Sequence, residues 1–240
     1  RMADSIREPG QPVVYEYRSD VIGAYIKSHP EYENIVIALS GDVGFYSGAK
    51  KLLDVLNGRK PEGVLADGFE EVEALGTVDV LRRGTIEVKT VSISDKKEVT
   101  GAHGISVVAD LLLNDVKEEE AEFLICPGGM PGAKNLGDCS ALVQLIQKHY
   151  DKGGYVAAIC AAPALVLSKI KMNKRHTMTC YPGFEGYLPD ADMQPHGVVV
   201  DGNVITGRGP AYAFKFGLAI LEQITSKKVA EEVAAGMLLD

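Results

Sequence analysis

The amino-acid sequence predicts an α/β protein in which helices cover both faces of a mostly parallel sheet. Short runs rich in β-branched residues alternate along the chain with segments of helical periodicity, which is the pattern of such a sheet. The predicted strands are almost continuously apolar, as strands buried on both faces are. The chain of 240 residues is long enough for one large domain, or for a domain with a small addition.

The expected strands, in chain order, are 12–17, 34–40, 63–66, 86–93, 123–129 and 155–160. The expected helices have apolar residues three and four positions apart, and they are 20–29, 46–57, 70–83, 138–151, 161–169 and 211–224. Residues 92–113 form two alternating runs joined by a polar, glycine-bearing turn, which predicts a β-hairpin. The polar segment 57–62 is the best candidate for a domain boundary.

Composition and charge exclude several classes of function. The 25 basic and 33 acidic residues give a net charge of −8 without a long block of either sign, so we expect no nucleic-acid partner. The four cysteines lack the spacing of a zinc site, so we expect no metal. The N-terminal "RMADSIREPGQP" carries charges where a signal peptide needs an apolar stretch, and no apolar run is long enough to span a membrane. We therefore expect a cytoplasmic protein.

One cysteine lies in the apolar, small-residue run "YVAAICAAPALVL", which covers residues 155–167. Small residues around Cys160 allow a strand to turn sharply into a helix, the geometry of a nucleophile elbow. The start of that helix favours a thiolate through its dipole, and Pro163 suits a first helical turn. A structural cysteine buried in an apolar strand gives the same pattern, so this motif alone leaves both interpretations open.

Two further motifs supply candidate partners for the sulfur. The strand that ends in "CPGGMPGAKNL" places Gly128 and Gly129 at the carboxyl edge of the sheet, where ligands of α/β proteins bind. Their N–H groups and that of Ala161 are candidates to stabilise an oxyanion, although a plain glycine turn explains the glycines too. In "ADGFEEVEAL", Glu73 falls on the apolar stripe of a helix, where a protonated carboxyl can orient a thiolate.

Six motifs in this order resemble the ThiJ/PfpI superfamily, and specifically its parkinsonism-associated deglycase branch. They are "LADGFEEVEAL", "VDVLRR", "LICPGGMPGAKNL", "AAICAAP", "TCYPGFE" and "GRGPAYAFKFGLAILE", within about residues 63–238. The resemblance implies a flavodoxin-like three-layer sandwich related to class I glutamine amidotransferases, usually a homodimer. It also implies that Cys160 is the reactive, oxidation-sensitive cysteine, that Glu73 contacts it, and that Gly128, Gly129 and Ala161 are the oxyanion positions.

The resemblance implies glyoxalase or deglycase chemistry on small α-oxoaldehydes, oxidative-stress protection and chaperone-like behaviour, with no cofactor. Ala161 stands where the protease branch has a histidine, which disfavours a Cys-His hydrolase. Tyr181 stands where some deglycase relatives have a histidine, and it can donate a hydrogen bond but is a poor base near neutral pH. His103 lies in the loop that approaches the partner's pocket, or is simply an exposed turn residue, and His176 and His196 read as surface-loop residues.

About residues 8–57 carry a second resemblance, to an internal piece of a precorrin or cobalt-precorrin methyltransferase. Its specific part is "SGDVGFYSGA", in which Gly41, Asp42, Gly44 and Ser47 match a cofactor and tetrapyrrole loop. The opening strand and second domain of those enzymes are missing, so we expect no methyl transfer.

We predict two parts, 1–60 and 61–240, with the first a β-α-β-α fragment that extends or completes the main sheet. Strand 34–40 is a candidate to replace the first strand of the family domain, beside 123–129. Such a junction suggests an engineered chimera, and a natural relative with a divergent N-terminus is the alternative. The competing functional interpretation is accordingly a non-catalytic scaffold whose thiol serves only redox sensing or packing.

Overall fold

The computed structural model describes residues 24, 61–116 and 121–239. The expected strands 12–17 and 34–40 and helix 46–57 lie outside these residues, as does helix 20–29 apart from Ala24. The loop residues Gly41, Asp42, Gly44 and Ser47 also lie outside the described residues. The predicted boundary near residue 60 and the origin of the first part therefore stay predictions.

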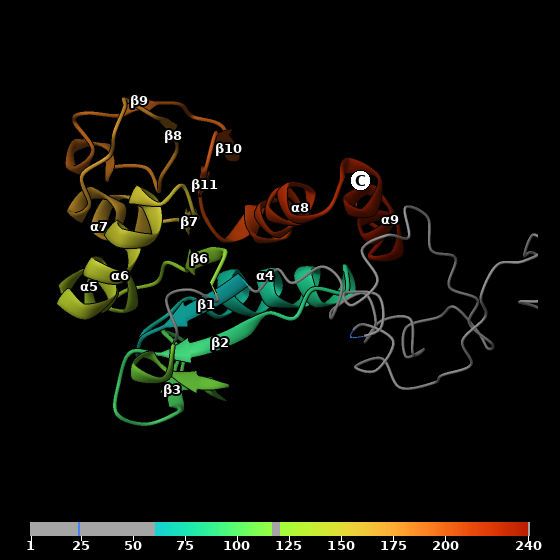
Figure 1. Cartoon of the computed structure of the whole chain (residues 1–240), viewed down its shortest axis with the longest axis horizontal. Coiled ribbons are helices and arrows are strands. Elements are labelled where there is room, and N and C mark those ends of the chain that lie inside the picture. The colour runs from blue at the N-terminus through green and yellow to red at the C-terminus, as the bar shows by residue number, and fades with distance from the viewer. Residues whose placement is uncertain (1–23, 25–60, 117–120, 240) are drawn as a thin grey trace, which may run out of the picture. The chain divides into compact units, whose positions relative to one another are not determined.

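The described part is built on a seven-stranded sheet in the order β10-β11-β7-β6-β1-β2-β5 (Figure 1). Only β10 and β11 pair antiparallel, and the other neighbours are all parallel. The strands are β1 (Pro61–Leu65), β2 (Lys89–Ser92), β5 (Leu111–Leu112), β6 (Phe123–Cys126), β7 (Tyr155–Ile159), β10 (Val198–Asp201) and β11 (Val204–Gly207).

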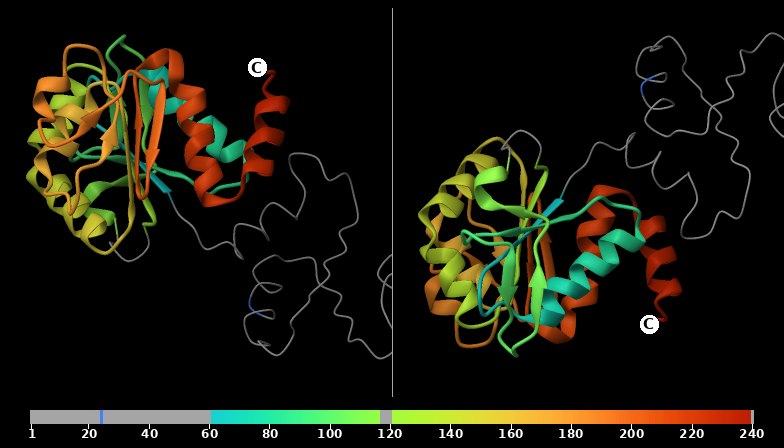
Figure 2. Two further views of the ribbon diagram at one scale, coloured as in Figure 1. Left: turned by 90° about the horizontal axis from the view of Figure 1, so that it is seen from above. Right: turned by 90° about the horizontal axis from the view of Figure 1, so that it is seen from below.

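Helices cover both faces of this sheet, as the two views of Figure 2 show. One layer holds α4 (Glu71–Arg83), α8 (Ala213–Ile224) and α9 (Lys227–Gly236), and the other holds α5 (Gly132–Asp138), α6 (Ser140–Asp151) and α7 (Ala162–Leu165). Every residue of the central strands β1 and β6 is buried, as expected for a sheet enclosed on both faces. The predicted three-layer α/β fold with a mostly parallel sheet is confirmed.

The two sides of β6 are both occupied. On one side β1 pairs with β6 through Pro61 and Phe123, and on the other β7 pairs with it through Tyr155 and Phe123. The position beside β6 that was predicted for residues 34–40 is therefore occupied by residues 61–65.

The segment 92–113 contains the predicted hairpin, formed by β3 (Glu98–Thr100) and β4 (Ser106–Val108), which pair antiparallel. The chain then returns to the main sheet, where β5 adds an edge strand parallel to β2. A short 3-10 turn, Leu113–Asp115, follows β5. The hairpin thus stands off the sheet as expected, while its end contributes a strand that the sequence did not predict.

Helices α4 and α8 approach closely because glycines replace side chains at their crossing. A Cβ on Gly217 of α8 would lie 3.0 Å from the Cβ of Val80 and 3.3 Å from the Cα of Thr77. A Cβ on Gly76 of α4 would lie 3.3 Å from the ring of Phe214. The close crossing packs the middle of α4, the helix that carries Glu73, directly on α8.

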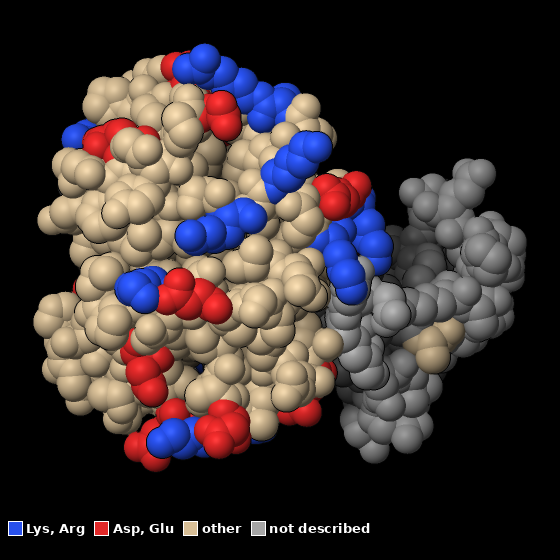
Figure 3. All heavy atoms as spheres, turned by 90° about the vertical axis from the view of Figure 1, so that its left-hand side faces the viewer, with Lys and Arg blue, Asp and Glu red and all other residues tan. Residues whose placement is uncertain are grey.

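Acidic and basic side chains lie beside one another on the face drawn in Figure 3. The described part of the chain also has ion pairs one helical turn apart, such as Lys134 with Asp138 and Lys227 with Glu231. Surface pairs of this kind contribute little to stability. In the described part of the chain, none of the helices combines the length and the apolar character that a membrane crossing needs.

Candidate active site

Cys160 lies in the tight turn between β7 and α7. Its φ of +64° is in the left-handed region, which residues other than glycine rarely adopt. Two backbone bonds hold the turn: the Cys160 N–H donates to the carbonyl of Gly207 (2.9 Å), and the Tyr181 N–H donates to the carbonyl of Cys160 (2.8 Å). Strain of this kind costs about 1–3 kcal/mol and is frequent at functional sites.

Glu73 enters the same place from the first turn of α4. Its side chain is buried, and the Gly128 N–H donates to its Oε2 (2.8 Å). A Cβ on Gly128 would lie 2.6 Å from the Cβ of Cys160, 2.7 Å from Oε2 of Glu73 and 3.0 Å from the Cys160 sulfur. The thiol and the carboxyl therefore converge on one glycine that has no side chain to separate them.

The backbone amides are divided differently from the sequence prediction. The N–H of Gly128 is occupied by Glu73, so it does not face the sulfur as an oxyanion donor. The N–H groups of Gly129 and Ala161 do reach the sulfur as hydrogen-bond donors. Only two of the three expected donors thus surround the thiol, and the third fixes the carboxyl.

Cys160 and Glu73 lie in a buried site that disfavours two negative charges. Burial raises the pKa of Glu73 to about 7, against the hydrogen bond from Gly128, and the charge of Glu70 adds to the rise. Burial, followed by the charge of Glu73, raises the pKa of Cys160 to about 12, although the amides of Gly129 and Ala161 act in the opposite direction. The sequence predicted that the start of the helix favours a thiolate. This expectation is wrong when Glu73 is charged, because burial and repulsion by Glu73 raise the pKa of the Cys160 thiol more than the two amides lower it.

The loop that carries Gly128 and Gly129 packs main chain against main chain. A Cβ on Gly129 would lie 2.4 Å from the nitrogen of Glu70, and one on Gly132 would lie 2.5 Å from the nitrogen of Phe69. The Glu70 N–H donates to the carbonyl of Gly128 (3.0 Å), and the Gly132 N–H donates to that of Gly68 (3.1 Å). The loop after β6 and the start of α4 are thereby held together without side chains between them.

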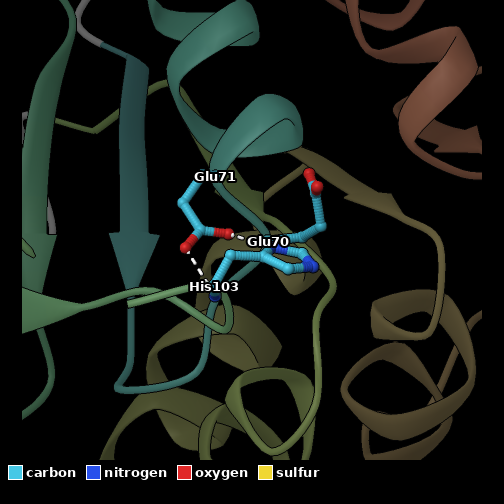
Figure 4. Close-up of side chains that lie close together, drawn as sticks. All are labelled: Glu70, Glu71 and His103. Carbon is cyan, nitrogen blue, oxygen red and sulfur yellow. Dashed lines mark hydrogen bonds and ion pairs between the residues drawn. The ribbon is translucent and has the colours of Figure 1, made fainter. Parts of the chain in front are cut away.

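The other two glutamates of the motif have structural partners. Glu70 caps α4, since its Oε2 accepts a hydrogen bond from the N–H of Glu73 (2.6 Å). Glu71 points at the hairpin, where it accepts from the N–H of His103 (2.7 Å) and lies 2.7 Å from the His103 ring nitrogen Nδ1 (Figure 4). The carboxylate docks against the backbone of Gly101, where a Cβ would be only 2.3 Å from Oε1.

His103 reaches the site only through α4. Its side chain is exposed, and its bonds go to Glu71, two residues before Glu73. The hydrogen bond with Glu71 raises the pKa of His103, and although burial raises the pKa of Glu71, its bonds with His103 bring it below the usual value. The sequence left open whether this histidine approaches a partner's pocket, and the structure shows how it is anchored.

Glu70, Glu71 and His103 also form a group whose ligand atoms lie within 4.8 Å of one another. Each of the two carboxylates already accepts a hydrogen bond from a backbone N–H, so the group is accounted for by the cap of α4 and by the anchoring of the hairpin.

The four cysteines are free thiols, and Cys126, deep in β6, has a pKa raised to about 12 by burial.

Tyr181 stands next to the cysteine along the same sheet edge. Its N–H donates a hydrogen bond to the carbonyl of Cys160. Its ring lies beside Gly209, where a Cβ would be 3.5 Å from the ring. Phe184 packs edge-to-face on Tyr181, with centroids 6.3 Å apart, and stacks on Tyr187 at 5.9 Å. The sequence singled out Tyr181 but not the two aromatic residues that follow it.

His176 was expected in a surface loop, and this expectation is wrong. Its ring is buried, with Nε2 2.8 Å from the hydroxyl of Tyr150 and Nδ1 3.2 Å from Oδ2 of Asp201. These hydrogen bonds join the ends of α6 and β10 to the loop before β8 (Thr177–Met178). Asp201 lies beside Val204 at the start of β11, whereas Cys160 lies beside Gly207 at its end. His196 is exposed as expected.

A mostly parallel sheet that carries a cysteine on a strained strand-to-helix turn, beside a buried carboxyl and backbone amides, defines an α/β protein with a candidate site at the carboxyl edge of its strands. Residues 64–223 match the model of the DJ-1/PfpI family. The chain belongs to this family, as the ordered motifs predicted. The match begins after residue 60, so it does not bear on the predicted methyltransferase resemblance.

Relatives of known name support the assignment. Protein dj-1beta of Drosophila melanogaster is 34% identical over 73% of this chain and 95% of its own length. Protein DJ-1 homologs A and B of Arabidopsis thaliana are 36% and 35% identical, but the chain spans less than half of their length, 45% and 40%. The glutathione-independent glyoxalase DJR-1.2 of Caenorhabditis elegans is 34% identical over 65% of this chain and 82% of its own. The structure of oxidized Toxoplasma gondii DJ-1 superposes with a TM-score of 0.71, at 33% identity, over 75% of this chain and 98% of that one.

Proposed function

We propose that this chain is a cofactor-independent enzyme of the glyoxalase or deglycase type, which converts small α-oxoaldehydes into 2-hydroxy acids. Cys160 is the nucleophile and Glu73 is the acid and base. The observation that carries the proposal is the convergence of the Cys160 sulfur and the Glu73 carboxyl on Gly128. The similarity to a relative named a glutathione-independent glyoxalase supports the reaction type.

In the reactive state Glu73 is protonated and Cys160 is a thiolate. A raised pKa of about 7 allows this carboxyl to be protonated near neutral pH, and its repulsion of the sulfur then disappears. Burial still raises the pKa of the sulfur in that state, and the N–H groups of Gly129 and Ala161 act against it by favouring the thiolate. A buried acid with a pKa near the working pH is suited to both giving and taking a proton.

With methylglyoxal, the thiolate attacks the aldehyde carbon and forms a C–S bond, while Glu73 gives its proton to the aldehyde oxygen. The Glu73 carboxylate then takes the hydrogen of that carbon as a proton and passes it to the neighbouring carbonyl oxygen, which gives an enediol. Glu73 next moves the proton of the first carbon's hydroxyl group to the neighbouring carbon, so that the first carbon becomes the thioester carbonyl. The result is a thioester of lactate on Cys160. Water attacks the thioester, the C–S bond breaks, and lactate and the thiol group are released.

The surrounding groups have supporting roles in this scheme. The Gly129 and Ala161 amides stabilise the negative charge that develops on oxygen or sulfur, as oxyanion donors do. Gly128 holds Glu73 in place through its N–H. Tyr181 lies at the edge of the site, where its hydroxyl is a hydrogen-bond donor rather than a base.

The test is the formation of lactate from methylglyoxal, followed by NMR, in the wild type and in Cys160→Ala. Cys139→Ala is the matched control, because Cys139 is a free, partly exposed thiol in the joint between α5 and α6. We expect activity in the wild type and the control and none in Cys160→Ala. Equal turnover in all three proteins would contradict the proposal of a Cys160-dependent enzyme and would favour the alternative, a non-catalytic scaffold.

We also propose that the chain forms a homodimer through α4 and the hairpin. Val72 and Leu75 of α4, together with Ile105 at the hairpin, are large apolar side chains that are exposed. Glu71 and His103 tie these two elements together, so their apolar residues present one surface. Sedimentation should show a dimer for the wild type and a monomer for Val72→Asp, and a monomeric wild type would contradict the proposal.

A further inference from the structure

The loop after β8 carries three aromatic side chains in a row of contacts, Tyr181, Phe184 and Tyr187. We call this group the aromatic platform. Phe184 packs at 80° on Tyr181 and at 27° on Tyr187, with centroids 6.3 and 5.9 Å apart. Tyr181 is 46% exposed and Tyr187 is 58% exposed. Apolar rings of this size are usually buried, so a contacting and exposed set is unusual.

The Tyr181 end of the platform lies beside the cysteine. The Tyr181 N–H donates to the carbonyl of Cys160 itself (2.8 Å), so the two residues are neighbours across one hydrogen bond. The ring of Tyr181 lies against Gly209, two residues after Gly207, whose carbonyl accepts the Cys160 N–H. The ring therefore lies at the same carboxyl edge as the thiol.

From this geometry we infer that the aromatic platform selects the substituent of the α-oxoaldehyde, and that the chain favours aryl over methyl substituents. This inference rests on the proposed function. The aldehyde carbon must reach the sulfur, and the group on the adjacent carbonyl carbon then extends toward the edge of the site. A phenyl group gains edge-to-face or offset contacts with the Tyr181 ring that a methyl group lacks.

The chemistry is the same as for methylglyoxal. The thiolate adds to the aldehyde of phenylglyoxal, Glu73 moves the hydrogen to the benzylic carbon, and water releases mandelate from the thioester. The atoms balance as phenylglyoxal plus water giving mandelate, with no oxidant or reductant. What the platform adds is binding of the phenyl ring in the transition state.

The experiment measures kcat/KM for phenylglyoxal and for methylglyoxal, following mandelate and lactate by NMR, and takes their ratio. Cys160→Ser supplies the background for each aldehyde, because phenylglyoxal also reacts with arginine side chains. An aromatic pair contributes about 0.5–1.5 kcal/mol beyond area, which corresponds to a ratio about two- to tenfold lower once the ring is lost. We expect that drop in Tyr181→Leu, a smaller one in Tyr187→Leu, and none in Tyr181→Phe, which keeps the ring.

Tyr155→Leu is the matched control. Tyr155 begins β7 and stacks on Phe123 at 4.4 Å, at the opposite end of the strand from Cys160. Its loss should leave the ratio of the two kcat/KM values unchanged, and circular dichroism of each variant checks that it is folded.

Two results would overturn the inference, and they differ from one another. A ratio that stays within twofold in Tyr181→Leu, while Cys160-dependent turnover of methylglyoxal persists, refutes the platform and leaves the proposed function intact. Turnover of neither aldehyde beyond the Cys160→Ser background refutes the proposed function and the inference with it.

Discussion

Gly128→Ala is the sharpest perturbation of the proposed site, because the new methyl group would occupy the point where Cys160 and Glu73 meet. The Cβ would lie 2.6 Å from the Cβ of Cys160 and 2.7 Å from Oε2 of Glu73. Ordinary van der Waals contact begins near 3.4 Å, so the shorter of these contacts must open by about 0.8 Å. Gly128 has no positive φ, so the backbone tolerates alanine and the effect is confined to the two side chains.

We expect kcat/KM for methylglyoxal to fall about 100-fold in Gly128→Ala, since a misplacement of about 1 Å has that effect on catalysis. The free energy of unfolding should fall by about 1–3 kcal/mol, as for other overpacked sites. Lactate formation and chemical denaturation measure the two quantities separately.

Gly236→Ala is the control for this substitution. Gly236 ends α9, has no positive φ, and a Cβ there would meet nothing within 4 Å. The variant should match the wild type in activity. If Gly128→Ala retained turnover within threefold of the wild type, the convergence on Gly128 would not be the reacting arrangement.

Three further predictions concern backbone strain and pH. Cys160→Gly should be more stable than Cys160→Ala by about 1 kcal/mol in denaturant unfolding, because only glycine adopts a φ of +64° without strain, and equal stabilities would argue against strain in the turn. The raised pKa of Glu73, about 7 against an ordinary 4.5, means that the folded state holds the proton more tightly, so the wild type should lose about 3 kcal/mol of stability as the pH rises from 4.5 to 7. Glu73→Gln should not show this loss, and parallel pH profiles of the two proteins would contradict the assignment. The pKa of Asp201 is lowered, chiefly by its hydrogen bond with Lys174, so its contribution is present above the ordinary pKa of 3.8 and is lost as the pH falls through the folded value. Asp201→Asn should therefore melt below the wild type at pH 7, with the gap narrowing toward pH 3, and a gap independent of pH would be inconsistent with this ion pair.

The central elements were predictable because their signals are local. Residues 70–83 show a clear helical period, and the structure has α4 at Glu71–Arg83. The apolar runs at 123–129 and 155–160 became β6 and β7, each slightly shorter because the chain turns at Pro127 and at Cys160. Such runs need burial on both faces, whatever lies beside them.

The missed elements had weaker or overlooked signals. The hairpin of β10 and β11 turns at "DGN", where Gly202 has a φ of +63°, and an Asp-Gly pair between alternating runs is a recognised hairpin signal. The short helix α5, Gly132–Asp138, offers few apolar residues in a helical period. The expected helix 161–169 is divided into α7 and a 3-10 turn, Leu167–Lys169.

Some features of the site could not be predicted from the sequence, because they depend on hydrogen bonds between residues far apart in the chain. Nothing local shows that the N–H of Gly128 faces Glu73, which is 55 residues away, instead of the sulfur. The same holds for His176, whose burial depends on Tyr150 and Asp201, 26 and 25 residues away. The pKa of Cys160 likewise follows from burial and from Glu73 rather than from the short helix that it precedes.

The main-chain packing of Gly129 and Gly132 against residues 68–70 separates the reacting groups from the residues that choose what they react with. Substitutions in the aromatic platform should leave this frame intact, because the hydrogen bonds that hold it join backbone atoms of residues 68–70, 128 and 132. New substrates are therefore best sought by varying the platform alone. Substitutions at Gly129 or Gly132, even to alanine, should abolish the proposed activity toward every substrate.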